Sequence, residues 1–229
     1  MATQLSIIIP TLNEAANIEV RLAALVSMRM EGVQLIVADG GSSDATVACV
    51  APWVDLVIDA PRGRAAQMNA GALHATAPYL LFLHADTALP IDASALIDHA
   101  LQHAVWGRFD ITLSGTHSML RVIAAMMNWR SRISGIATGD QAIFVRRDVF
   151  ERLGGFASIA LMEDIELCSR LKKIAAPACL KQRVISSGRR WQRHGVWRTI
   201  WLMWRLRFAY FCGADPRALA QQYGTLPPT

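Results

Sequence analysis

Apolar runs and amphipathic segments alternate along the first ninety residues of the chain. The apolar runs predict buried strands at residues 5–9, 33–38, 54–58 and 79–83. The segments between them have helical spacing and predict helices over residues 15–27, 45–50 and 65–74. Continuous apolar strands separated by helices are typical of an α/β protein with a mainly parallel sheet covered by helices on both faces.

Beyond residue 88 the pattern is less regular but continues to mix strands and helices. Helical spacing predicts helices over residues 93–103, 119–132, 163–174 and 196–211. Apolar runs predict further strands at residues 109–113 and 141–145. No repeat or linker interrupts the chain, so we expect a single domain over residues 1–229.

Polar clusters follow three of the predicted strands. They occupy Thr11–Glu14, Asp39–Asp44 and His84–Asp86. Ligands of parallel α/β sheets bind beyond the carboxyl ends of the strands, and all three clusters fall at that edge. The sequence therefore predicts a binding site there.

The residue types in these clusters suit a phosphorylated ligand. Asp39 opens a loop of glycines and serines whose backbone N–H groups can approach phosphate, although such loops also cap many helices. Arg64, which follows Gly63 at the start of a predicted helix, suits a diphosphate. His84 and Asp86 are candidate ligands of a divalent cation shared with substrate phosphates, and an aspartate at a strand end also serves as a cap.

Two further segments contain groups that suit sugar chemistry. Glu163 and Asp164 stand at the start of a predicted helix, where acids complement the helix dipole and where a carboxylate is also placed to act as a general base. Gly139 and Asp140 form a small polar turn able to line a sugar pocket. Pro10 stands where a dinucleotide-binding motif requires glycine, which argues against a dehydrogenase.

Taken together, six segments strongly resemble the inverting family 2 glycosyltransferases. In chain order they read SIIIPTLNEAANI, VADGGSSDAT, RGRAAQMNAGA, LLFLHADT, TGDQAIFVRR and LMEDIELCSRL. The resemblance covers roughly residues 5–175. The small size, the His-Ala-Asp-Thr form and the Ser-Gly-Arg-Arg-Trp segment resemble a bacterial subgroup often named with radical-SAM and selenium-domain genes.

The resemblance implies a GT-A fold, a Rossmann-like α/β fold that binds a nucleotide-diphospho-sugar. It further implies a nucleotide-binding half over residues 1–90, an acceptor half over 91–180 and a basic, Trp-rich helical extension over 181–229. The donor is expected to be UDP-linked and the acceptor a hydroxyl compound, with a lipid-linked acceptor among the candidates. The residues carried over to the nucleotide and substrate site are Pro10, Thr11, Asn13, Glu14, Asp39, Ser42, Asp44, Gly63, Arg64, Asn69, Gly139, Asp140, Arg190 and Trp191.

The resemblance also implies a metal and a catalytic base. Asp86 matches the last acid of the family's Asp-x-Asp motif and is the expected metal ligand. His84 departs from that motif, and because imidazole binds Mn²⁺ better than Mg²⁺, manganese is the expected cation. Asp164 matches the catalytic base, with Glu163 beside it. Arg190 and Trp191 resemble a Gln-x-x-Arg-Trp element of processive relatives, but the glutamine is missing here, which argues against processive synthesis.

Two other functions are alternatives to sugar transfer. A sugar-nucleotide pyrophosphorylase needs a Gly-x-Gly-x-Arg loop after its first strand, which this chain lacks. A non-catalytic nucleotide-sugar-binding or regulatory protein on the same fold is supported only by His84. The intact Glu163-Asp164 pair counts against it.

The charge of the chain is unevenly distributed. The formal net charge is +5, yet Leu171–Ala214 contains ten basic residues and no acid, while the remainder has a net charge of −5. This split predicts an anionic partner for the basic segment. Because no nucleic-acid-binding motif accompanies the charge, we expect phosphate or a membrane surface and not nucleic acid.

Tryptophans are concentrated in the same basic segment. Trp191, Trp197, Trp201 and Trp204 lie within fourteen residues. Their spacing fits one buried helix face, with Trp201, Trp204 and Phe208 as core; it equally fits a membrane interface or a protein partner. Without a basic signal region or a spanning stretch, we expect a cytoplasmic protein with weak peripheral contact to the inner face of the membrane. The oligomeric state is not predicted.

Overall fold

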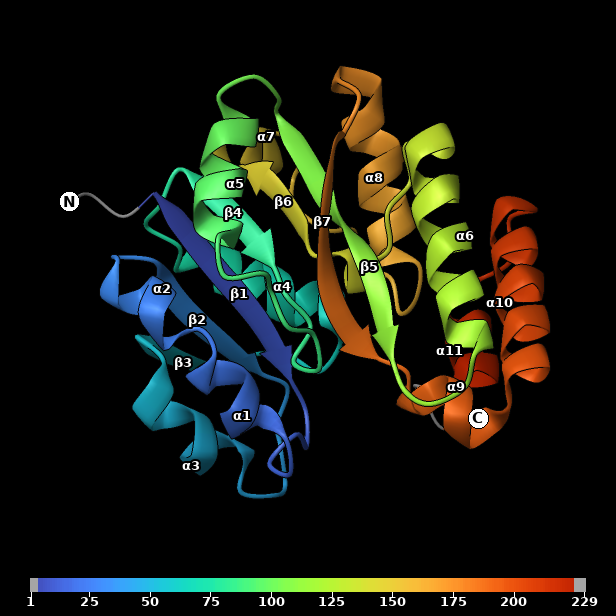
Figure 1. The fold of residues 1–229 in the computed structure, drawn as a ribbon, viewed down its shortest axis with the longest axis horizontal. Helices are drawn as coiled ribbons and strands as arrows, with labels where there is room; N and C mark the ends of the chain where they lie inside the picture. The colour runs from blue at the N-terminus through green and yellow to red at the C-terminus, as the bar shows by residue number, and fades with distance from the viewer. Residues whose placement is uncertain (1–3, 225–229) are drawn as a thin grey trace.

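A seven-stranded sheet runs through the computed structural model, which describes residues 4–224 (Figure 1). Its strands are β1 (Leu5–Thr11), β2 (Gln34–Asp39), β3 (Leu56–Asp59), β4 (Tyr79–Phe82), β5 (Trp106–Ser114), β6 (Ile143–Arg146) and β7 (Ala178–Ser187). They lie in the order β3-β2-β1-β4-β6-β5-β7, and only the pairs that involve β6 are antiparallel. The predicted α/β class with a mainly parallel sheet is confirmed.

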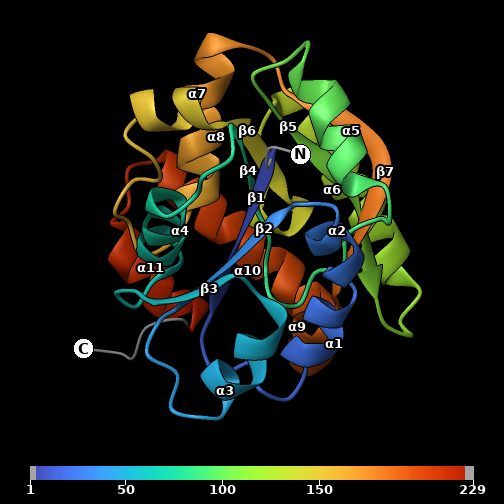
Figure 2. The same ribbon diagram turned by 90° about the vertical axis from the view of Figure 1, so that its left-hand side faces the viewer.

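Helices cover both faces of this sheet. They are α1 (Ile18–Ala23), α2 (Val26–Met30), α3 (Thr46–Val50), α4 (Arg64–Leu73), α5 (Ala93–Leu101), α6 (Met119–Ser134), α7 (Arg147–Arg152), α8 (Glu163–Ile174), α9 (Arg189–His194), α10 (Val196–Phe211) and α11 (Pro216–Tyr223). Figure 2 shows α1, α2, α5 and α6 on one side of the strands and α4, α7 and α8 on the other. The two short 3₁₀ turns are Ala51–Trp53 and Gly139–Gln141.

Alternate side chains of β1 pack into two separate apolar cores. Ile7 and Ile9 pack with α1, α2 and α5, whereas Ile8 packs with α4 and α7 on the opposite face. All seven residues of β1 are buried. Successive side chains of a strand point to opposite faces, so a strand covered on both faces must be apolar throughout.

The helix predicted over residues 15–27 is instead two short helices, α1 and α2, the first beginning at Ile18. The backbone N–H groups of Glu14 and Ala15 donate to the Thr46 hydroxyl and the Asp44 carboxylate at 2.8 and 3.2 Å. These bonds hold the start of the segment against the loop after β2. The chain therefore enters the helix later than its apolar spacing indicates.

Strand β7 was missed because a bulge interrupts its pattern. Its pairing with β5 runs from Phe109 opposite Leu180 to Asp110 opposite Arg183, which leaves Lys181 and Gln182 without partners in the register. Both extra residues are exposed. An inserted polar pair breaks the alternation on which strand prediction depends.

Helix α10 begins and ends where the spacing predicts, but its aromatic face is exposed and not buried. Trp201, Trp204 and Phe208, expected as core in one interpretation, are 63%, 69% and 72% exposed. The buried side of the helix is formed by Leu206, which packs with Leu219 of α11 and with Ile165. The core interpretation of the aromatic residues is wrong.

Within the described residues, none of the helices combines the length and apolarity needed to cross a bilayer. The four cysteines are free thiols.

We predict that Gly71→Ala destabilises the fold. A Cβ at this position of α4 would overlap Cγ2 of Ile8 in the fully buried strand β1. Overpacking of this kind costs about 1–3 kcal/mol, more than the gain of about 1 kcal/mol from the better helix propensity of alanine. Urea unfolding should show the loss. The double variant with Ile8→Ala removes the overlap and should lose less than the two single changes added together.

Candidate active site

The strand ends bring the predicted site residues to one edge of the sheet. Thr11 pairs with Asp39 at the carboxyl ends of β1 and β2, and Pro10 precedes it inside β1. Because β6 runs antiparallel to β4, with Ile143 opposite Phe82, the Gly139–Gln141 turn lies at the edge where His84 and Asp86 follow β4. The carboxyl end of β7 reaches the same edge.

Asp39 organises the loop after β2. Its carboxylate accepts hydrogen bonds from the hydroxyls of Thr11 and Ser42 at 3.1 and 2.5 Å and from the N–H groups of Gly41 and Ser42 at 3.0 and 2.7 Å. Burial would raise the pKa of Asp39, but these bonds outweigh it and lower the pKa. With only 2% of its surface exposed and four bonds accepted, Asp39 fixes the loop conformation.

The loops after β1 and β2 are cross-linked by their own side chains. Asn13 adopts a left-handed backbone with φ of 54°. Its N–H donates to the Ser42 hydroxyl at 2.9 Å, and its side-chain oxygen accepts from the N–H of Ser43 at 2.8 Å. Thr46 bonds strongly to Asp44, which lowers the pKa of that carboxyl. The two loops therefore form one preorganised wall.

Two amide side chains of α4 hold this wall and its surroundings in place. The Gln67 amide is buried and donates to the backbone oxygens of Thr11 and Ala38 at 2.7 and 2.8 Å. The Asn69 amide donates to the oxygen of Phe156 and accepts from its N–H at 2.8 and 2.9 Å, which ties α4 to the segment before α8. Gly63, with φ of 132°, precedes α4 and opens onto free space.

Asp164 is held at the first turn of α8 by two backbone donors. The N–H of Gly139 donates to its Oδ2 at 2.8 Å, and the N–H of Ile165 donates to its Oδ1 at 2.7 Å. The carboxylate remains partly exposed. Contacts from two segments far apart in sequence fix its orientation, as a positioned general base requires.

His84 packs against the turn that supports Asp164. Its Nδ1 lies 3.1 Å from Oδ1 of Asp140, and its Nε2 occupies the space that a Cβ on Gly139 would need. Desolvation in the cleft would raise the pKa of Asp140, but the bond to His84 and the nearby positive charges lower it. Both ring nitrogens of His84 thus face the 139–140 turn.

Arg64 and Glu163 bring opposite charges into the same cleft. Burial and the neighbouring Asp164 raise the pKa of Glu163, while Arg64 lowers it. Arg64 is an exposed residue. Desolvation by its surroundings would lower its pKa, but the negative charges of Glu163, Asp140 and Asp164 together outweigh this and raise the pKa of Arg64. A guanidinium therefore stands opposite the candidate base.

The carboxylates of Asp86 and Glu14 both lie near the guanidinium of Arg189. Its Nη2 lies 3.9 Å from Oδ2 of Asp86 and 3.8 Å from Oε2 of Glu14. Burial raises the pKa of Glu14, Arg189 lowers it, and Asp86 raises it again. Two partly exposed carboxylates fit a divalent cation that also binds substrate phosphates. Within residues 4–224 no group of three or more His, Cys, Asp and Glu side chains is placed to hold a metal by itself.

The C-terminal helices add residues that the sequence reasoning missed. The Arg190 guanidinium stacks 3.6 Å from the centroid of the Tyr223 ring. Its Nη2 donates to the backbone oxygen of Tyr223 at 2.7 Å. Burial raises the pKa of Tyr223, whereas the charges of Arg64 and Arg190 lower it. The end of α11 therefore lies at the cleft. Trp191, in contrast, packs partly buried against the apolar core.

Two more arginines, from α6 and α10, interact electrostatically with Asp164. Burial, together with the charge of Arg207, lowers the pKa of Arg130 to about 10. Burial lowers the pKa of Arg207, opposed by Asp164 and Asp140. Nε and Nη2 of Arg130 are buried without a hydrogen-bond partner. Their sequence signal was only an arginine in each helix, without a motif.

Backbone strain is concentrated at this edge. Among the described residues, the non-glycine positions with positive φ are Asn13, Ala142 and Met162. Each of them flanks a candidate site element: the loop after β1, the 139–141 turn and the first residue of α8. Strained residues persist where surrounding structure over-determines them, as in ligand sites.

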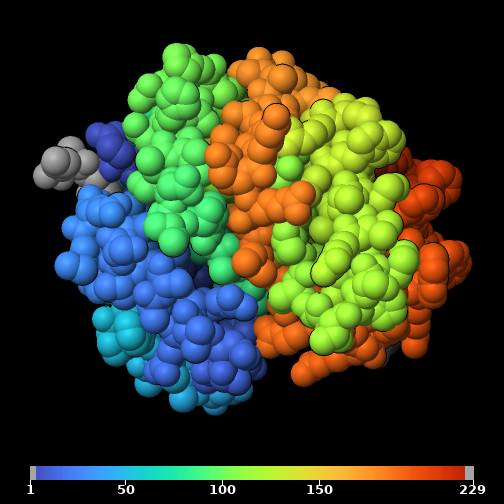
Figure 3. All heavy atoms as spheres, viewed as in Figure 1, coloured from blue at the N-terminus to red at the C-terminus, as the bar shows by residue number. Residues whose placement is uncertain are grey.

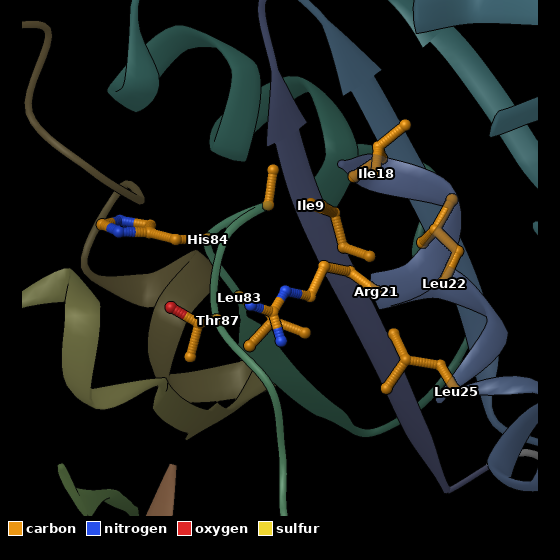
Figure 4. A pocket seen from close by; sticks show the side chains of 9 residues that line it. Ile9, Ile18, Arg21, Leu22, Leu25, Leu83, His84 and Thr87 are labelled. Atoms are coloured by element: carbon orange, nitrogen blue, oxygen red, sulfur yellow. The ribbon is translucent and has the colours of Figure 1, made fainter. Parts of the chain in front are cut away.

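A small cavity of about 10 Å³ lies behind the site (Figure 4). The residues that line it include Ile9, Arg21, Leu22, Leu83 and His84. It has room for one water molecule at most. The ligand site is therefore the open edge and not this cavity.

The comparisons with known proteins agree with this geometry. The sequence profile described as "Glycosyl transferase family 2" matches residues 6–155. The chain therefore belongs to glycosyl transferase family 2 and is a glycosyltransferase. No curated protein sequence matches the chain.

Solved structures share the fold at low identity. The mannosyltransferase PcManGT from Pyrobaculum calidifontis, in complex with GDP-Man and Mn²⁺, is 18% identical with a TM-score of 0.66, over 97% of this chain and 69% of that chain. TarS 1-349 from S. aureus with UDP-GlcNAc is 17% identical with a TM-score of 0.63, over 81% and 58%. Glucosyl-3-phosphoglycerate synthase from Mycobacterium tuberculosis with Mn²⁺ and UDP is 16% identical with a TM-score of 0.56, over 79% and 70%. The fold is the GT-A fold.

We predict a pH-dependent loss of stability in Asp39→Asn. The folded pKa of Asp39 lies below its unfolded value of about 3.9, so the charged carboxylate stabilises the fold above that pH and stops doing so as pH falls through the folded pKa. At pH 7 the variant should lose about 2 kcal/mol, and its deficit should shrink below about pH 4. Urea unfolding across pH measures this. Asp59→Asn, at the exposed paired position of β3, should change stability by less than about 0.5 kcal/mol; an equal loss there would contradict the assignment.

Proposed function

We propose that this glycosyltransferase transfers a sugar, with inversion, from a nucleotide-diphospho-sugar to an acceptor hydroxyl, with Asp164 as the general base. The observation that carries the proposal is the placement of Asp164. Its carboxylate is fixed by the N–H of Gly139, is partly exposed, and lies in the same electrostatic environment as Arg64. A base on the acceptor side and a cation on the donor side are the two requirements of the reaction.

In the proposed reaction, Asp164 accepts the proton of the acceptor hydroxyl as its oxygen attacks the anomeric carbon of the sugar. A new carbon–oxygen bond forms on one face while the bond to the diphosphate oxygen breaks on the other. The nucleoside diphosphate leaves with that electron pair. Glu163 lies beside the proposed base, and burial together with the charge of Asp164 raises its pKa.

The donor is proposed to lie along the wall formed by the loops after β1 and β2. Asp39 shapes this wall through Ser42, so its contribution to base recognition includes the loop it holds in place. The guanidinium of Arg64, at the start of α4, suits a diphosphate. UDP-linked sugars are the first donors to test, since relatives of this fold are solved with UDP-GlcNAc and UDP, although PcManGT is solved with GDP-Man.

A divalent cation is proposed at Asp86, with Glu14 near it; His84 would join as a ligand only by turning a ring nitrogen away from the 139–140 turn. The paired carboxylates around Arg189 fit a cation that completes its shell with phosphate oxygens. Such a cation would neutralise negative charge on the departing diphosphate. Mn²⁺ is preferred over Mg²⁺ because of the imidazole, and Arg189 would supply further positive charge at the same place.

The acceptor is proposed to be a hydroxyl compound carried on a lipid, which places the enzyme on the cytoplasmic face of a membrane. The acid-free basic segment, with its exposed tryptophans, favours such a location.

We expect Asp164→Asn to abolish turnover and to leave donor binding intact. Loss of a general base typically reduces the rate by about 10²–10⁴, whereas the amide keeps the shape of the side chain. Steady-state turnover with calorimetry of UDP binding separates the two effects. Glu163→Gln, the adjacent isosteric change, is the matched control and should retain more activity. Near-normal turnover by the Asp164 variant would assign the role to Glu163.

We expect Asp86→Ala to weaken UDP binding in the presence of Mn²⁺ and to remove its dependence on the cation. The physical reason is the loss of the carboxylate proposed to link cation and diphosphate. Calorimetry with Mn²⁺, with Mg²⁺ and with EDTA measures the effect. Asp59→Ala, an exposed aspartate at the end of β3, is the control. UDP affinity that is unaffected by both the Asp86 change and EDTA would show that the metal assignment is wrong.

A further inference from the structure

Helix α10 exposes a continuous aromatic stripe to solvent. Its members recur at intervals of three and four residues and so share one face of the helix; they are Trp197, Trp201, Trp204, Phe208 and Phe211. Their exposed fractions range from 63% to 72%. The opposite face of α10 is packed through Leu206 and Thr199. This helix is therefore apolar on its outer side as well as its inner side.

Helix α6 repeats the arrangement beside it. Its outward residues at the same intervals are Val122, Met126, Trp129 and Ile133, which are 50–69% exposed. The start of α10 joins the same apolar cluster as the inner face of α6. Figure 3 shows the yellow-green side chains of α6 adjoining the orange-red side chains of the C-terminal helices at one end of the molecule. Two neighbouring helices thus leave large apolar side chains uncovered at the same end.

The charge around the α10 stripe is uniformly positive. Arg198 and Arg205 lie on α10 and Arg193 lies on α9, all three exposed, within the segment that contains no acidic residue. The Arg205 guanidinium lies 5.0 Å from the centroid of the Trp201 ring. Tryptophan and phenylalanine beside arginine match the interface of an anionic bilayer, where rings enter the acyl boundary and guanidinium groups meet lipid phosphates.

We propose that the outer faces of α6 and α10 form a docking surface for an anionic lipid membrane. The aromatic stripe lies flat in the interface, and the arginines around it attract the negatively charged lipid. Charge complementarity selects this occupant: a second copy of the chain would bring the same acid-free basic segment against itself. The surface stands independently of the reaction proposed for the site.

The inner faces of the same helices approach the catalytic carboxylates. Arg130 follows Trp129 on α6, and Arg207 precedes Phe208 on α10; both guanidinium groups interact electrostatically with Asp164. Docking through the outer faces therefore holds the candidate site one helix diameter, about 10 Å, from the membrane surface. Resting on the proposed function, this favours an acceptor that is a membrane lipid with a negatively charged head group.

Vesicle co-sedimentation of the full chain tests the surface. We expect binding to vesicles of phosphatidylcholine with phosphatidylglycerol at low salt, with little binding at high salt or to phosphatidylcholine alone. Each aromatic side chain withdrawn from the interface should reduce the partition coefficient about tenfold. Trp201→Ser with Trp204→Ser and Phe208→Ser should then abolish measurable binding. Arg193→Gln with Arg198→Gln should reduce it about 25-fold, since each basic residue contributes about fivefold.

A matched triple variant separates membrane docking from general surface apolarity. Met30→Ser with Leu73→Ser and Ile91→Ser removes three side chains that are 85–94% exposed elsewhere, and binding should not change. Circular dichroism and UDP calorimetry verify that each variant folds. The proposal is overturned if the unmodified chain does not co-sediment at low salt, or if the Trp201 triple variant binds like it. It is also overturned if light scattering shows a dimer that the same variant dissociates while vesicles bind neither protein.

Discussion

The burial of β1 on both faces is the constraint on which the rest of the structure depends. Because helices cover the strand from both sides, every residue from Leu5 to Thr11 is buried, and between Ser6, whose hydroxyl bonds to Gln34, and Thr11 at the strand end the side chains are apolar. Beyond that end the amide of Gln67 donates to the backbone oxygens of Thr11 and Ala38, and the carboxylate of Asp39 accepts from the Thr11 hydroxyl. The same pattern applies to β2 and β4, so the chemistry of the protein collects along one edge.

At that edge the structure uses backbone as much as side chains to position reactive groups. Asp164 is oriented by the N–H of Gly139, and the small size of Gly139 also makes room for the ring of His84. Met162 and Ala142 accept unfavourable backbone conformations on either side of this contact. Rigid placement of a carboxylate in this way reduces the reorganisation needed during reaction.

The fold of the first half follows from the sequence because each element has one period and one environment. The strands are mostly apolar, and the motifs around Asp39 and Asp86 follow the ends of β2 and β4, so topology brings these two together, while Asp164 reaches them from the first turn of α8. Prediction failed where local pattern and tertiary contact disagree. Lys181 and Gln182 hide β7 by interrupting its alternation, and α10 is apolar on two faces, so its spacing could not reveal which one is buried. Arg189 and Tyr223 reach the site through the C-terminal helices, for which no motif exists.

The order of strands in the sheet also dictates an order of assembly. Strands β1, β2 and β3 pair with near neighbours in sequence, but both partners of β5, namely β6 and β7, follow it in the chain. During synthesis one edge of β5 must therefore wait for β6 and the other for β7, which is complete only at residue 187, and such non-local pairing slows folding. Arg108 and Asp110 bond to each other within this waiting strand. Charged side chains in an open strand disfavour pairing with other chains, and β5 carries Arg108 and Asp110 where its edges are last to be covered.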